Sequence, residues 1–73
     1  MEQAVLKAHL ALAERHVADG EEVIAKQLRL IAELQAKGLD TRKSEALLKE
    51  FEITQALHVG DRDRLRKELA NAE

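Results

Sequence analysis

The first half of the chain repeats apolar or small residues at spacings that alternate between four and three. The repeat runs through Leu6, Leu10, Ala13, Val17, Gly20, Ile24, Gln27, Ile31 and Leu34. Such a repeat places its members along one side of an α-helix that packs against another helix. The rest of the composition agrees, because Ala, Leu, Glu, Lys, Arg and Gln dominate, with no proline and one aromatic residue. The pattern predicts an all-α protein.

The stretch KGLDT predicts the end of one helix and the start of the next. Gly38 suits the left-handed backbone conformation that often follows a helix. Asp40 or Thr41 can accept the free backbone N–H groups that open a new helix. We therefore predict one domain over residues 1–73, with helices over about 3–37 and 41–70 and a turn at 38–40. So short a connection makes the two helices antiparallel neighbours.

Each helix of this hairpin directs one line of side chains at the other helix, and we call that contact the seam. The predicted seam contains Leu10, Val17, Gly20, Ile24, Ile31, Leu48, Phe51, His58 and Leu65. If the chain folds back near residue 39, residues equally far from the turn lie side by side, because both helices rise about 1.5 Å per residue. Gly20 is then level with His58, and Ala13 with Leu65. Buried polar side chains such as Gln27 and Gln55 would fix this register.

Two helices cannot cover all the apolar side chains of this chain. A chain of 73 residues buries only about 60% of its unfolded surface, and without cysteine it has no disulfides. The apolar or small positions left outside the seam include Val5, Leu12, Val23, Leu30, Ile53, Leu57 and Gly60. We expect these residues to form the interface of a homodimer, in which two hairpins pack as a four-helix bundle.

The charges argue against nucleic acid and membranes as partners. The net charge is -2, and acidic and basic residues are interleaved. The basic run from Arg62 to Leu69 is interrupted by Asp63 and Glu68 and carries no aromatic residue to stack on a base. The first sixteen residues contain charges that break up any signal or membrane segment. A cytoplasmic protein is the expectation.

Three histidines are the only candidates for metal chemistry. His9 and His16 lie seven residues apart on one side of the first helix, and His58 lies in the predicted seam. Helical-bundle metal sites combine a histidine with a glutamate three residues earlier, but Ala13 and Gln55 stand at those places. We therefore predict no metal, cofactor or catalytic residue and no enzymatic activity. A bundle that binds a metal or small ligand through His16 and His58 is kept as the alternative.

The stretches HVADGEEVIAKQLRLIAEL, GLDT and LLKEFEITQALHVGDRDRLRKEL resemble a group of short helical-hairpin proteins from proteobacteria, especially alphaproteobacteria. The likeness spans about residues 16–69. It implies a bacterial cytoplasmic hairpin and supplies no catalytic or binding residue.

The sequence thus favours a small structural or interaction module that associates with itself and docks a further protein partner. A regulator that exchanges its own dimer contacts for those of a partner is a third hypothesis.

Overall fold

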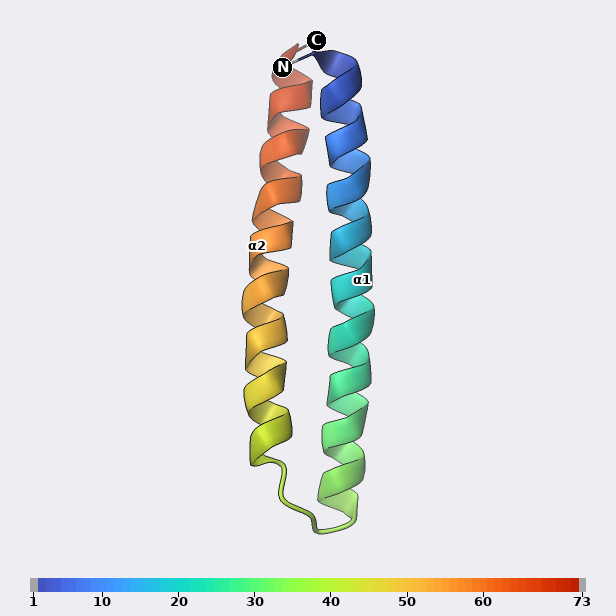
Figure 1. Cartoon of the computed structure of the whole chain (residues 1–73), viewed down its shortest axis with the longest axis vertical. Helices are drawn as coiled ribbons and strands as arrows, with labels where there is room; N and C mark the ends of the chain where they lie inside the picture. The colour runs from blue at the N-terminus through green and yellow to red at the C-terminus, as the bar shows by residue number, and fades with distance from the viewer. Residues whose placement is uncertain (1, 73) are drawn as a thin grey trace.

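The protein is a helical hairpin of two long antiparallel helices. A computed structural model describes residues 2–72 and contains α1, Gln3–Ala36, and α2, Arg42–Ala72. The helices lie side by side, with the start of α1 and the end of α2 at the same end of the molecule (Figure 1). The hairpin measures 55 × 14 × 13 Å. The predicted all-helical hairpin is confirmed, and each predicted helix limit lies within two residues of the observed one.

The turn forms because Gly38 accepts a backbone conformation that other residues avoid. Its φ angle is +69°, in the left-handed region. Gly38 N–H donates to the Gln35 carbonyl at 3.0 Å, and Leu39 N–H donates to the Leu34 carbonyl at 2.9 Å. These two bonds satisfy carbonyls that the end of α1 would otherwise leave free. The turn thus stops α1 and reverses the chain.

Asp40 organises the start of α2. Its Oδ1 accepts the backbone N–H of Arg42 at 3.0 Å, and its carboxylate also accepts the Arg42 guanidinium at 2.8 to 3.1 Å. The side-chain hydrogen bond from Arg42 lowers the pKa of Asp40 below its ordinary value, and the backbone bond acts in the same direction. Asp40 therefore supplies the acceptor that the turn sequence predicts.

The core is a thin line of side chains between the helices. A cluster of Leu6, Ala13 and Leu65 lies near the open end of the hairpin, with Leu10 and Leu69 packed against it. Val17, Gln27 and Ile31 are the other buried residues in the part of the chain that the structure describes. The core is small because a two-helix hairpin has only one contact surface. Ala13 and Leu65 belong to the same cluster.

Two glutamine side chains bridge the helices. Gln27 Nε2 donates to the Ser44 carbonyl at 2.8 Å, and Gln55 Nε2 donates to the Val17 carbonyl at 2.9 Å. Both bonds join a side chain of one helix to the backbone of the other. Because they depend on the position of the opposite helix along its axis, they hold the helices in one register. Thr54 is exposed, and no such bridge from it occurs among the described residues.

The predicted register is wrong by about one helical turn. Gln55, and not His58, lies against Gly20, while the ring of His58 lies against His16. The reason is the path of the connection, which climbs back beside the last turn of α1, so that α2 begins at a higher level than α1 ends (Figure 1). The predicted register assumes that residues equally far from residue 39 lie at the same level, and it therefore leaves out this rise of the connection.

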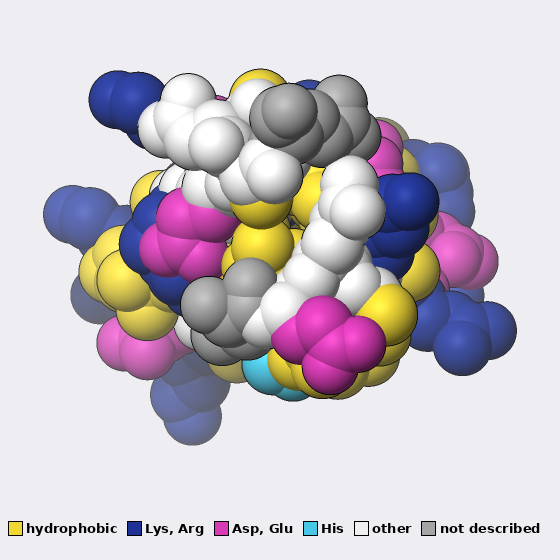
Figure 2. Space-filling model, turned by 90° about the horizontal axis from the view of Figure 1, so that it is seen from above, with side chains coloured by type: hydrophobic (Ala, Val, Ile, Leu, Met, Phe, Trp, Pro, Cys, Tyr) yellow, Lys and Arg dark blue, Asp and Glu magenta, His cyan; other side chains and the backbone are white. Residues whose placement is uncertain are grey.

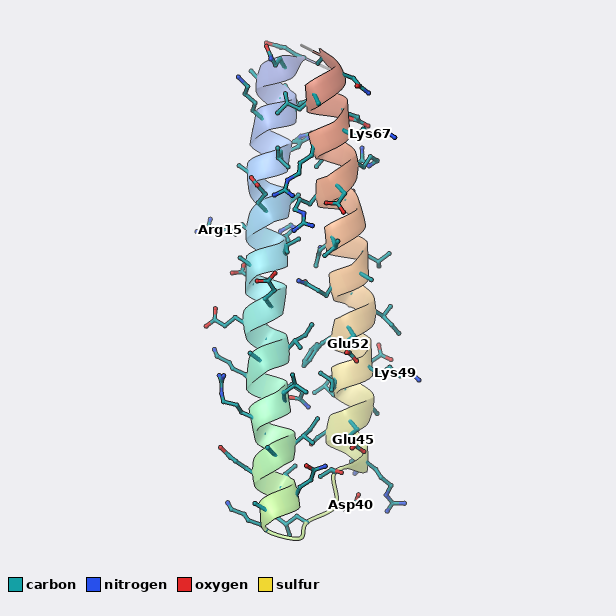
Figure 3. All side chains as sticks on the ribbon, turned by 180° about the vertical axis from the view of Figure 1, so that it is seen from behind. Arg15, Asp40, Glu45, Lys49, Glu52 and Lys67 are labelled. Carbon is teal, nitrogen blue, oxygen red and sulfur yellow. The ribbon has the colours of Figure 1, made fainter. Side chains whose placement is uncertain are left out.

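Charged side chains occupy the outer surface. Arg15 on α1 and Lys49 and Lys67 on α2 point away from the opposite helix (Figure 3). Among residues 2–72, one ion pair joins the two helices, between Glu14 and Arg66 at 3.1 Å, and both partners are about half exposed. Such exposed ion pairs contribute little to the free energy of folding. The packing of the seam therefore holds the hairpin together. Neither helix described is long and apolar enough to cross a membrane.

Candidate functional site

All nine residues predicted for the seam lie between the helices or at their margin. Val17, Ile31 and Leu65 are buried, and the other six are half-buried: Leu10, Gly20, Ile24, Leu48, Phe51 and His58. The two polar or small members, Gly20 and His58, lie at mid-height together with Gln55 and replace large apolar side chains there. This is where the hairpin opens into a cavity.

The cavity has a volume of about 370 Å³ and lies between the middle turns of the two helices. Its walls include His16, Asp19 and Val23 of α1 and Phe51, Thr54 and His58 of α2. A second cavity, of about 170 Å³, shares His16 and extends toward the open end past His9, Leu12 and Asp61. The two therefore form one groove along a single side of the hairpin, with His16 at the junction.

His16 and His58 form a pair across the helices at this junction. Their ring centroids are 5.0 Å apart, with 46° between the ring planes. His16 is exposed and His58 is half-buried, so solvent reaches the pair. The alternative hypothesis had joined His16 and His58, and the structure brings these two together.

Asp61 is the acidic neighbour of the pair, but it is already engaged. Arg64 donates to Asp61 Oδ1 at 2.8 Å and to Glu68 Oε1 at 3.0 Å. The hydrogen bond from Arg64 lowers the pKa of Asp61, and the nearby imidazoles of His58 and His16 act more weakly in the same direction. Within residues 2–72 of one chain, no three His, Cys, Asp or Glu side chains converge as a metal ion requires. One hairpin offers two imidazoles and no third ligand.

Gly20 lines the cavity, and the side chain of Gln55 lies directly against it. A Cβ atom at Gly20 would overlap Gln55 Oε1 and stand 2.7 Å from its Cδ. Gln55 Oε1 is buried and accepts no hydrogen bond among the described residues. The glycine thus makes room for the amide that bridges to Val17. Sequence reasoning placed Gly20 in the seam but missed Gln55 as its partner.

Gly60 has no comparable neighbour. The space around the position of its Cβ is open to 4 Å, and α2 continues through it as one helix. The structure of one hairpin therefore provides no packing reason for this glycine.

The predicted interface residues lie at the surface. Val5, Leu12, Val23 and Leu30 are 39 to 53% exposed, and Leu57 is 71% exposed. Hydrophobic side chains are visible between the helices and again on the outside, with a histidine beside them at one edge (Figure 2). Ile53 is also exposed, at 57%, and with Gly60 it flanks Leu57 on its outer side.

Five of these residues share the side of the hairpin that contains the groove. Leu12 and Val23 line the cavities, and Val5 and Leu30, each seven residues from one of them, fall on the same stripe of α1. Leu57 lies on α2 between Thr54 and Asp61, which line the same cavities. We call Val5, Leu12, Val23, Leu30 and Leu57 the groove face.

The three arginines of the basic run of α2 are each paired with a nearby acid. Arg62 pairs with Asp63 at 3.0 Å, Arg64 with Asp61 and Glu68, and Arg66 with Glu14. A phosphate backbone would have to displace these carboxylates.

Comparison of this chain with protein-family models, with curated proteins and with solved structures finds no match. The resemblance to alphaproteobacterial hairpins therefore stays a prediction.

Proposed function

We propose that this protein is a self-associating structural module, in which two hairpins pack through their groove faces to form a four-helix bundle. The observation that carries the proposal is the groove face itself. Its five large apolar side chains remain exposed beside a core of only a few buried residues. Extended apolar strips on a small protein mark an interaction surface.

The order of the side chains along α1 favours a second copy as the occupant of the groove face. They are arranged symmetrically about a point between Val17 and Ala18. Val5 and Leu30 lie equally far from that point on either side, and so do Leu12 and Val23. In a twofold contact between antiparallel helices, each residue meets the one placed symmetrically to it. Every apolar residue of this stripe would therefore face another apolar residue.

The polar residues near the midpoint obey the same symmetry. His16 and Asp19 are equally far from it, so His16 of one copy would lie beside Asp19 of the other. Arg15, which makes no ion pair among the described residues, would come within one turn of Glu22 of the second copy. Opposite charges at these positions favour the antiparallel arrangement.

The second helix fits this geometry. Because His16 lies against His58, the midpoint of α1 is level with Leu57 and His58 on α2. Leu57 of the two copies would meet near the twofold axis, and this contact would cover the large hydrophobic side chain with the highest exposed fraction among the described residues. Removing the exposed part of each of the ten groove-face side chains from water contributes on the order of 1 kcal/mol. The sum over the ten side chains is comparable to the free-energy cost of bringing two chains together, about 4 to 15 kcal/mol.

Sedimentation equilibrium of wild type and two matched variants tests the proposal. Leu12 is 53% exposed on the groove face, and Leu28 is 51% exposed on a different side of the same helix. We expect a dimer for wild type and for Leu28→Lys, and a monomer or a much weaker dimer for Leu12→Lys. A wild-type monomer at micromolar concentration, or equal loss in both variants, would refute the groove-face dimer.

Disulfide cross-linking tests the orientation, because the chain has no cysteine of its own. A mixture of Leu12→Cys and Val23→Cys chains should form the mixed disulfide readily on oxidation. Leu12→Cys alone should not form a disulfide at comparable rate, because its own symmetry mate lies about 16 Å away along the helix. Faster linkage of Leu12→Cys to itself would indicate parallel helices.

A further inference from the structure

We infer that the dimer binds a divalent transition metal ion, of which Zn²⁺ is the representative, between the His16 and His58 pairs of its two copies. This inference depends on the groove-face dimer proposed above. The described residues of one hairpin bring two imidazoles and no third ligand to this place, so the site is incomplete without the second copy.

The spacing of the two rings fits a shared metal ion. Zn²⁺ binds imidazole nitrogen at about 2.0–2.1 Å with tetrahedral geometry, and two rings so bound have centroids about 5 Å apart. The observed separation is 5.0 Å. The pair also spans α1 and α2, so its two rings are held by different helices whose register Gln55 fixes.

The position of the pair brings two such pairs together. His16 lies next to the midpoint of the α1 stripe, and His58 lies at the same level on α2. The twofold axis of the proposed dimer passes through this level, between the two groove faces. Four imidazoles would then occupy one layer of the four-helix bundle, and four neutral nitrogen ligands complete a tetrahedral Zn²⁺ site.

The surroundings suit metal binding. The cavity of about 370 Å³ leaves room beside both rings. Asp19 lines that cavity and makes no ion pair among the described residues. In the antiparallel dimer it would lie beside His16 of the second copy, where a carboxylate can accept the remaining ring N–H of a metal-bound histidine. Asp61 is held by Arg64 and is not needed as a ligand.

The test is titration of the metal-free full chain with Zn²⁺ by calorimetry, with sedimentation in EDTA as a separate measurement of the dimer. We expect one Zn²⁺ per two chains and a tighter dimer when the metal is bound. His16→Gln and His58→Gln should each weaken Zn²⁺ binding on the order of tenfold or more. His9→Gln is the matched control, because His9 lies two turns away on the same helix and should leave binding unchanged.

The two proposals fail in different ways. A dimer in EDTA that takes up no Zn²⁺, or that binds one Zn²⁺ per chain, overturns the metal site and leaves the groove-face dimer in place. Equal loss of binding in His9→Gln and His58→Gln also overturns it, provided that circular dichroism shows both variants folded. A chain that is monomeric both in EDTA and with Zn²⁺ refutes the dimer, and the metal site with it.

Discussion

Gly20 and Gln55 should be energetically coupled, and a double-mutant cycle measures that coupling. Gly20→Ala replaces a glycine inside a helix, a change that by itself stabilises a helix by about 1 kcal/mol. Here the new Cβ would overlap Gln55 Oε1, so the amide must move away from the Val17 carbonyl. Loss of that hydrogen bond destabilises by about 0.5–1.5 kcal/mol. The two effects nearly cancel, and we expect Gly20→Ala to change the free energy of unfolding little.

The same substitution should behave differently once Gln55 is shortened. In a Gln55→Ala background no amide lies over Gly20, so Gly20→Ala should stabilise by the full value of about 1 kcal/mol. The expected coupling energy is therefore about 1 kcal/mol, or about 4–8 °C in melting temperature for a chain of this size.

Urea denaturation followed by circular dichroism gives the four free energies. All four proteins must be compared at one chain concentration, because a dimer makes apparent stability depend on concentration. Gly60→Ala is the matched control, since its Cβ meets open space and its effect should be the same in both backgrounds. If Gly20→Ala has equal effects with and without Gln55, to within about 0.5 kcal/mol, the steric argument is refuted.

Three other changes follow from the same structure. Gly60→Ala should stabilise the hairpin by about 1 kcal/mol, as judged by urea denaturation, because it improves helix propensity without a clash; a loss of stability would indicate that Gly60 packs closely against another chain. Gln27→Ala should destabilise by about 1–2 kcal/mol, since it removes the buried bond to the Ser44 carbonyl and leaves a gap; an unchanged denaturation midpoint would show that this bridge is not needed. Asp40→Asn should reduce the acid sensitivity of the melting temperature. Folding lowers the pKa of Asp40, so its contribution is present above the ordinary value of 3.8 and is lost as pH falls through the lower folded value; an Asn variant that loses stability in acid as steeply as wild type would contradict this.

Much of the fold could be read from local patterns. The alternating spacing from Leu6 to Leu34 predicts a helix with one contact side, and Gly38 followed by Asp40 predicts where it stops and the next begins. These features depend on residues close together in the sequence, so they can be predicted without knowledge of the tertiary structure. The exposed positions of Val5 and Leu57 follow in the same way, because a residue off the seam of a two-helix hairpin has no other helix to cover it.

The candidate site depended on the register, which local patterns do not determine. The height at which α2 begins relative to the end of α1 is set by the path of three residues after Gly38, and an error of one turn exchanges Gln55 for His58 as the neighbour of Gly20. Sequence alone therefore determined that the chain makes two antiparallel helices with apolar residues left over. Only the tertiary structure decided that His16 meets His58, because a contact across helices requires their relative position to within less than one turn.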